Sequence, residues 1–185
     1  MKLVLTGNGK GKTTSAVGLG IRAWGHGKRV LIVAFLKDLE VSGEWRAIKR
    51  IDDPALKAVS FGRKCPYNGQ DCCPGKGECI VTNSNKSEED YRLAEAGLHF
   101  VSQQFEHGKY DVIILDEIWN VYQLFPLWRE YITFMLQNSS SDIDIITTGR
   151  LFPAELKDSF DLITNMDKIK HPYNQGITAR KGIDY

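Results

Sequence analysis

A glycine-rich run near the amino terminus carries the residue types that bind phosphate. Its members are Thr6, Gly7, Asn8, Gly9, Lys10, Gly11, Lys12, Thr13 and Thr14. Glycines let successive backbone N–H groups turn toward one anion, and a helix that begins at the turn adds the positive end of its dipole. Lys12 would reach the phosphate oxygens, and the Thr13 hydroxyl would bind Mg²⁺. The run therefore predicts a phosphate-binding loop, with Thr6 at the first glycine position of the usual G-x-x-x-x-G-K-[ST] pattern.

Two adjacent carboxylates, Asp116 and Glu117, end a short apolar run that begins after Tyr110. A continuous apolar run is typical of a parallel strand that is covered on both faces. The carboxyl ends of such strands meet at the edge where open α/β sheets bind ligands. We therefore expect Asp116 and Glu117 to face the loop and to hold Mg²⁺, directly or through water.

Each motif also has a purely structural interpretation. The loop could be a glycine-rich turn with an incidental lysine, and the acidic pair could be a solvated turn at the end of a strand. The presence of both motifs in one chain favours a site for a nucleoside triphosphate and Mg²⁺. It does not specify the reaction.

Strand-like and helix-like segments alternate along the chain, which predicts a mostly parallel sheet flanked by helices. The expected fold is α/β, of the P-loop NTPase-like (RecA-like) type, in a single domain over residues 1–185 with a Cys-rich loop insertion at about 63–83. The expected strands cover residues 2–5, 29–35, 58–61, 110–117, 143–148 and 160–164. The expected helices cover residues 16–24, 43–51, 87–105 and 127–136, and a brief helix starts at Pro153.

Composition excludes several classes of protein. The 185 residues are 42% hydrophobic and 25% charged, with a net charge of +1, so no electrostatic case exists for a nucleic-acid partner. No stretch approaches the roughly 20 apolar residues that span a bilayer. The amino end leads directly into a strand and lacks the pattern of a secretory signal. We therefore expect a cytoplasmic protein.

All four cysteines lie close together in the segment rich in glycine and proline. They are Cys65, Cys72, Cys73 and Cys79. Clustering of this kind in a cytoplasmic chain favours a metal or redox role, but the spacing matches no standard zinc or iron–sulfur signature. Structural Zn²⁺, free thiols, a disulfide pair and an iron–sulfur cluster all remain open.

Several segments resemble the P-loop ATP:corrinoid adenosyltransferases, in family order and across nearly the whole chain. They are the loop at 7–14, the segments 22–28 and 35–37, Gly43-Glu44, Leu115-Asp116-Glu117, Thr148-Gly149-Arg150, and the tail segments 170–173 and 182–185. A phosphate loop alone is unspecific, whereas its combination with Thr-Gly-Arg and this tail is specific to the family.

The resemblance implies transfer of the 5′-deoxyadenosyl group of ATP to the cobalt of a reduced corrinoid, with release of triphosphate. It also implies that the triphosphate lies in the loop in the reverse sense to that of ordinary ATPases. Thr13 and Glu117 would be the main Mg²⁺ ligands, with Asp116 supporting them, and Arg150 would neutralise phosphate charge. Lys12 would stabilise the leaving triphosphate.

On the corrinoid side, the family usually carries Phe-x-Trp after the third strand, whereas this chain has Phe61-Gly62-Arg63. Phe61 and Tyr67 are the residues that would take this role. The resemblance further implies a homodimer and an electron donor, a flavoprotein or similar protein, that reduces Co(II). Two other functions fit the motifs alone: a nucleoside kinase or ATPase with a zinc lobe, and a non-catalytic regulator or carrier that binds ATP or a corrinoid.

Overall fold

Six parallel strands form one sheet, in the order β3-β2-β4-β5-β1-β6. The computed structural model describes residues 1–38, 40, 42–65, 80–170, 176 and 180–183. The strands are β1 (Lys2–Thr6), β2 (Val30–Phe35), β3 (Leu56–Phe61), β4 (Val112–Asp116), β5 (Asp144–Thr148) and β6 (Leu162–Asn165). Strand β5 separates the strand that leads into the glycine-rich loop from the strand that ends in the acidic pair.

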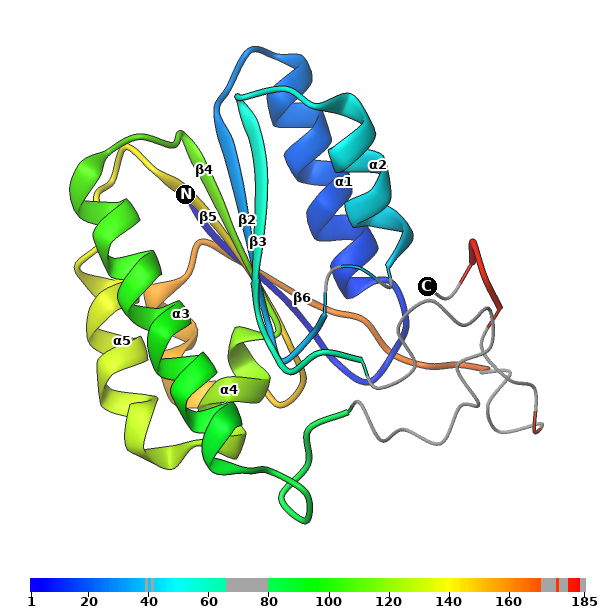
Figure 1. The fold of residues 1–185 in the computed structure, drawn as a ribbon. Coiled ribbons are helices and arrows are strands. Elements are labelled where there is room, and N and C mark those ends of the chain that lie inside the picture. The colour runs from blue at the N-terminus through cyan, green and yellow to red at the C-terminus, as the bar shows by residue number, and fades with distance from the viewer. Residues whose placement is uncertain (39, 41, 66–79, 171–175, 177–179, 184–185) are drawn as a thin grey trace.

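Helices cover both faces of the sheet (Figure 1). On one face lie α1 (Lys12–Gly25) and α2 (Gly43–Ile51), and on the other lie α3 (Glu88–His107), α4 (Ile118–Leu124) and α5 (Arg129–Gln137). Two 3₁₀ helices, at Pro126–Trp128 and Ala154–Ser159, complete the described elements. No helix in the described part of the chain is long and apolar enough to cross a membrane.

Successive side chains of the central strands point to opposite faces of the sheet, and so contribute to two hydrophobic cores, one on each face. In β2, Leu31, Val33 and Phe35 pack toward α3, α4 and α5, whereas the residues between them pack toward α1 and α2. Strand β4 divides in the same way, and all five of its residues are buried. A run that is apolar at every position therefore suits these strands, because each face of the sheet is covered.

The structure confirms the predicted fold class and most of the predicted elements. Ser87 and Asp90 form a capping box at the start of α3. One helix, α4, is absent from the sequence-based expectation, because it has only seven residues and directly follows the acidic pair. The helix expected from residue 127 begins instead at Arg129, after a 3₁₀ turn in which the Trp128 amide donates to the carbonyl of Phe125.

Two helical glycines should respond in opposite ways to the same substitution. A Cβ on Gly97 would lie 2.6 Å from Cε1 of Phe35 and 2.9 Å from Cγ of Phe61, whereas a Cβ on Gly18 would meet nothing within 4 Å. We expect Gly97→Ala to lower the free energy of unfolding by about 1–3 kcal/mol through overpacking. Gly18→Ala should raise it by about 0.5–1 kcal/mol, because alanine favours the helix. Urea unfolding measures both, and equal changes would contradict the close packing of α3 on the sheet.

Candidate functional site

The glycine-rich loop joins β1 to α1 and is packed against the chain that follows β6. A Cβ on Gly7 would lie 2.5 Å from the carbonyl oxygen of Met166, and one on Gly9 would lie 2.6 Å from it. The amide of Gly9 donates to this same carbonyl over 2.6 Å. Gly7 and Gly11 both have positive φ, at 101° and 106°. The loop therefore needs glycine for close packing at two positions and for backbone conformation at two, with Gly7 serving both.

Lys12 folds back into the loop. Its side chain donates to the carbonyl oxygens of Gly7 and Gly9, over 2.8 and 2.6 Å, and the residue is only 9% exposed. Burial lowers the pKa of Lys12 below its usual value, and the positive charges of Arg150 and Lys37 lower it further, against the opposing effect of Glu117. The ammonium group thus lies inside the glycine-rich turn, held by two backbone carbonyls that an anion could replace.

Asp116 ends β4 and is almost fully buried. Its carboxylate accepts hydrogen bonds from the hydroxyls of Thr13 and Thr148, over 2.9 and 2.6 Å. Thr148 ends β5, the strand that lies between β1 and β4. The structure therefore brings the carboxylate of the predicted acidic pair into direct contact with the predicted metal-binding threonine of the loop.

Glu117 lies at the amino end of α4 in a left-handed conformation, with φ of 65°. Its amide donates to Thr148 Oγ1 over 2.9 Å, which fixes the turn. One carboxylate oxygen, Oε1, is 3.0 Å from the side-chain nitrogen of Lys37. The other, Oε2, is buried and has no hydrogen-bond partner among the residues that the structure describes. A strained backbone and an unsatisfied buried oxygen are both costly, and such features concentrate at functional sites.

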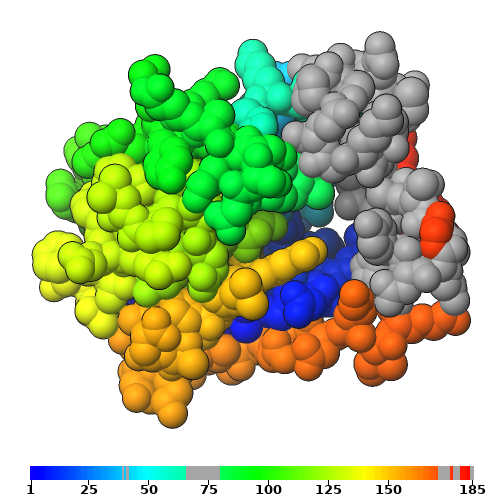
Figure 2. All heavy atoms as spheres, turned by 90° about the horizontal axis from the view of Figure 1, so that it is seen from below, coloured from blue at the N-terminus to red at the C-terminus, as the bar shows by residue number. Residues whose placement is uncertain are grey.

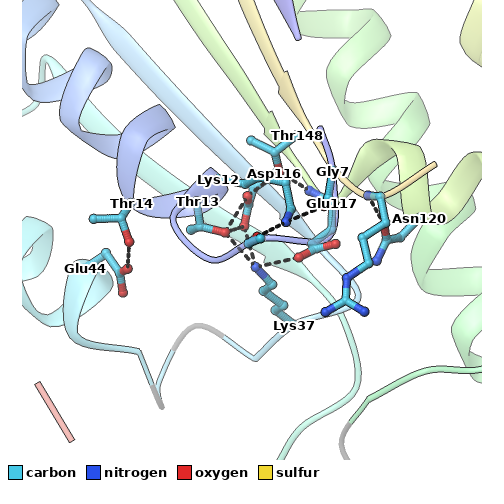
Figure 3. A network of polar contacts seen from close by, with 12 residues as sticks. Gly7, Lys12, Thr13, Thr14, Lys37, Glu44, Asp116, Glu117, Asn120 and Thr148 are labelled. Atoms are coloured by element: carbon cyan, nitrogen blue, oxygen red, sulfur yellow. Dashed lines mark hydrogen bonds and ion pairs between the residues drawn. The ribbon is translucent and has the colours of Figure 1, made fainter. Parts of the chain in front are cut away.

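Lys37 is a site residue to which the sequence analysis gave no role. Figure 3 shows its ammonium group beside Thr13, Asp116 and Glu117. The nitrogen is 2.8 Å from Asp116 Oδ2 and 3.0 Å from Thr13 Oγ1. Burial alone would lower the pKa of Lys37, but the two carboxylates outweigh burial and raise it above its usual value. Asp116 was predicted because it lies at the carboxyl end of a parallel strand. Lys37 follows β2 at the same edge, so the same rule would also have indicated Lys37.

Arg150 follows β5 at the same edge. Gly149, with φ of 144°, lets the chain pass close to α4, where a Cβ would lie 2.7 Å from that of Trp119. The Arg150 amide then donates to Asn120 Oδ1 over 2.7 Å. The positive charge of Arg150 contributes to lowering the pKa of Lys12. Figure 2 looks onto this edge, where amino-terminal residues in blue lie in a recess beside the green and orange parts of the chain.

The remaining loop residues are peripheral to this cluster. Asn8 and Lys10 are exposed, and the Thr14 hydroxyl lies 3.5 Å from Glu44 Oε1. Thr6 ends β1, and its carbonyl accepts from the Met166 amide over 2.8 Å.

The two residues expected on the corrinoid side are only partly described. The ring of Phe61 packs against those of Phe35 and Phe100, with centroids 6.4 and 5.5 Å away. It therefore contributes to the contact between β3 and α3. Tyr67 lies outside the described residues.

The cysteine cluster is described only at its first member. Cys65 is buried with a free thiol, and its amide donates to Asp38 Oδ2 over 2.9 Å. Cys72, Cys73 and Cys79 lie outside the described residues. Among the residues that the structure does describe, no three His, Cys, Asp or Glu side chains are grouped to hold a metal. The zinc alternative therefore gains no support, and the insertion at 63–83 is seen only at its two ends.

An ion pair lies at the start of the segment that was expected to be an insertion, with the Asp90 side chain buried and that of Arg63 partly exposed. Arg63 donates to both carboxylate oxygens of Asp90, over 2.9 and 2.6 Å. Burial would raise the pKa of Asp90, but the hydrogen bonds from Arg63 and Ser87 lower it below its usual value. A carboxyl group with a lowered pKa stabilises the fold above its unfolded pKa of about 4, and this contribution is lost as the pH falls further.

Removal of Arg63 should therefore cost stability in a pH-dependent way. We expect Arg63→Met to lower the free energy of unfolding by about 2–3 kcal/mol at pH 7, because it leaves a buried carboxylate without its charged partner. The difference from the wild type should shrink as the pH falls below about 4, where the carboxyl group becomes protonated. Urea unfolding at several pH values measures this. Arg92→Met, which breaks the exposed pair with Glu88 on the same helix, should cost less than about 0.5 kcal/mol.

Comparison with known proteins gives a consistent result. The family model described as ATP:corrinoid adenosyltransferase BtuR/CobO/CobP matches residues 1–185. The chain is 27% identical to a corrinoid adenosyltransferase of Sinorhizobium sp, over 99% of this chain and 79% of that protein. It is 28% identical to the corrinoid adenosyltransferase CobA of Salmonella typhimurium, over 99% of this chain and 84% of that one.

Among solved structures, the chain is similar to the flagellar accessory protein FlaH from Methanocaldococcus jannaschii. The TM-score is 0.48 at 15% identity, over 89% of this chain and 69% of that chain. The fold class rests on the strand order and on the covered faces of the sheet, and not on this similarity.

Proposed function

The chain belongs to the ATP:corrinoid adenosyltransferase family of BtuR, CobO and CobP, and we propose which of its residues perform the family reaction. That reaction transfers the 5′-deoxyadenosyl group of ATP to a Co(I) corrinoid. We assign the triphosphate to the loop around Lys12. We assign Mg²⁺ to Thr13 and Glu117, with Asp116 orienting Thr13.

The contacts around the acidic pair support the metal assignment. Thr13, Asp116 and Glu117 present only oxygen atoms, which Mg²⁺ prefers. Oε2 of Glu117 is buried without a partner, as expected of an oxygen whose partner is a ligand. The ammonium of Lys37 lies among all three residues, so the position already accepts a cation. When bound, Mg²⁺ would neutralise charge on the triphosphate.

The chain's own residues then need only to position ATP and to stabilise the leaving group. In the reaction, the cobalt attacks the 5′ carbon, a Co–C bond forms, and the C–O bond breaks with its electron pair going to triphosphate. Co(I) is the nucleophile, so no activated Ser or Cys and no base is required. Lys12, Arg150 and the loop amides face the developing negative charge. This role agrees with the reversed orientation of the triphosphate, which we propose on the basis of the family.

Three features of the proposal rest on the family and not on the described geometry. A donor, a flavoprotein or similar protein, would reduce Co(II) to Co(I). The protein would act as a homodimer in the cytoplasm. Phe61 and Tyr67 would stand near the corrinoid, although the contacts of Phe61 with α3 indicate a mainly structural role for its ring.

An anaerobic assay with ATP, Mg²⁺ and chemically reduced Co(I) corrinoid tests the proposal. A light-sensitive alkylcobalt product, formed with one triphosphate per product, is the expected result. Release of ADP without alkylation would instead indicate a kinase or ATPase, and binding without any product would indicate a regulator or carrier. Repeating the assay with cobalamin and cobinamide would show which corrinoid is preferred.

A further inference from the structure

The contacts of Lys37 are not explained by the assignments above. Its ammonium group donates to Thr13 and Glu117, the two residues assigned to the metal, and to Asp116, which orients Thr13. A monovalent side-chain cation and a divalent metal ion would therefore compete for the same group of side chains. The two cations would repel each other strongly at such close range in a partly buried site.

The backbone on both sides of Lys37 is held in a special conformation. Leu36 is left-handed, with φ of 59°, and its amide donates to the carbonyl of Phe61. Gly62 packs so closely that a Cβ on it would lie 2.2 Å from the Lys37 amide nitrogen. The next residue, Asp38, accepts from the Cys65 amide. A bulky residue such as Leu36 is strained in the left-handed conformation, and backbone strain of this kind is concentrated at functional sites.

The side chain is partly exposed, although its ammonium group makes three close contacts. Lys37 is 34% exposed, whereas the Asp116 side chain is 1% exposed. The anchored backbone therefore fixes where the lysine begins, while its flexible four-carbon stem can move the ammonium group toward solvent. In Figure 3 the stem of Lys37 comes from the side of the carboxylates opposite to the strands.

We propose that Lys37 is a built-in counter-ion that occupies the metal position in the nucleotide-free protein and moves to the triphosphate when the metal enters. This inference rests on the proposed metal assignment and names a positioning residue that the family reaction does not require by itself. Two adjacent carboxylates would repel each other without a cation, so Lys37 stabilises the empty site. Entry of a divalent ion releases the ammonium group, which then pairs with the oxygens of the arriving anion. Metal and nucleotide are thereby favoured together over either ligand alone.

Direct measurement of metal binding tests the inference without any need for turnover. Mn²⁺ serves as the probe, and its free ion is followed by electron paramagnetic resonance in the absence of ATP and corrinoid. For Lys37→Met we expect Mn²⁺ to bind about tenfold more tightly than to the wild type, because the competing cation is gone. The same variant should bind the Mn²⁺–ATP complex about tenfold more weakly, since it lacks the charge that would meet the triphosphate. A merely structural role for Lys37 would weaken both.

Control variants test whether the change in Mn²⁺ binding comes from the charge of Lys37 and arises at this site. Lys37→Arg keeps the charge and should not tighten Mn²⁺ binding, and Lys28→Met removes a lysine paired with Asp144 at the opposite edge of the sheet and should change nothing. The double variant Lys37→Met/Asp116→Asn should lose the tight binding, which locates the ion at this site. Unchanged or weaker Mn²⁺ binding in Lys37→Met overturns the inference, as does tight binding that survives in the double variant. If Lys37→Met does not fold, Lys37→Gln gives the same readouts. None of these results depends on whether the transferase reaction is correct.

Discussion

Lys12→Ala should lower kcat/KM for adenosyl transfer by about 10²–10³-fold while the fold persists. Lys12 donates to the carbonyls of Gly7 and Gly9 inside the glycine-rich loop. Those contacts do not hold a distant element in place, so their loss has little effect on the core. In the proposed function, the lost ammonium group would stabilise the charge that develops on the departing triphosphate. A loss of this size corresponds to about 3–4 kcal/mol of transition-state stabilisation.

The assay is steady-state transfer from ATP to Co(I) corrinoid, with unfolding in urea measured on the same preparation. Lys28→Ala is the matched control, because Lys28 lies beyond the other end of α1 and pairs with Asp144 on the surface. It should keep wild-type activity. Near-normal turnover by Lys12→Ala would refute the role of the loop, whereas a collapsed fold would show that Lys12 is structural.

The sheet was predictable because β2 is apolar at every position and β4 is apolar up to its last residue, Asp116. Strands β2 and β4 are buried on both faces, and no other short element gives an uninterrupted run of this kind. Helix α3 was predictable from the capping box at Ser87 and Asp90. Helix α4 was not, since its seven residues are too few to show a helical period.

The site residues that belong to a sequence motif were predictable. Those that join the site only because the fold brings them there were not. Lys12, Thr13, Asp116 and Glu117 were expected together, and the structure brings them together. Thr148 and Lys37 complete the same cluster from β5 and from the end of β2, but neither residue type has a fixed spacing to the loop. Only the order of the strands reveals that four strand ends converge there.

The sequence is also uninformative about structure in the tail after residue 170 and in the cysteine segment. Their residues have no clear period, and they resemble the family only by short sequence matches. Where the chain leaves regular elements, sequence alone does not fix which donors meet which acceptors. The anchoring of Cys65 to Asp38 and of Arg63 to Asp90 joins residues 27 positions apart in each case, which no local pattern indicates.

Glu117→Gln should weaken metal binding but leave the free energy of unfolding nearly unchanged. We expect this variant to lose about 10²–10³-fold in transfer activity at low Mg²⁺ and to recover part of it as Mg²⁺ is raised, because a neutral amide is a poorer ligand than a carboxylate. Its free energy of unfolding should change by less than about 1 kcal/mol, because the amide oxygen can still accept from Lys37 and Oε2 has no partner to lose among the described residues. The measurement is the Mg²⁺ dependence of the rate, together with urea unfolding.

Asp116→Asn should behave differently, because Asp116 accepts hydrogen bonds from several side chains of the site whereas Glu117 contacts fewer. Its two oxygens accept from Thr13, Thr148 and Lys37, and an amide nitrogen in place of Oδ2 would face the Lys37 ammonium, which cannot accept a hydrogen bond. The variant should therefore lose activity at every Mg²⁺ concentration and also lose about 1–3 kcal/mol of stability. Asp111→Asn, at the opposite end of the same strand and paired with Arg29, should retain full activity. If both site variants were rescued equally by Mg²⁺, Asp116 would be a direct ligand like Glu117, and the division of roles between the two carboxylates would be wrong.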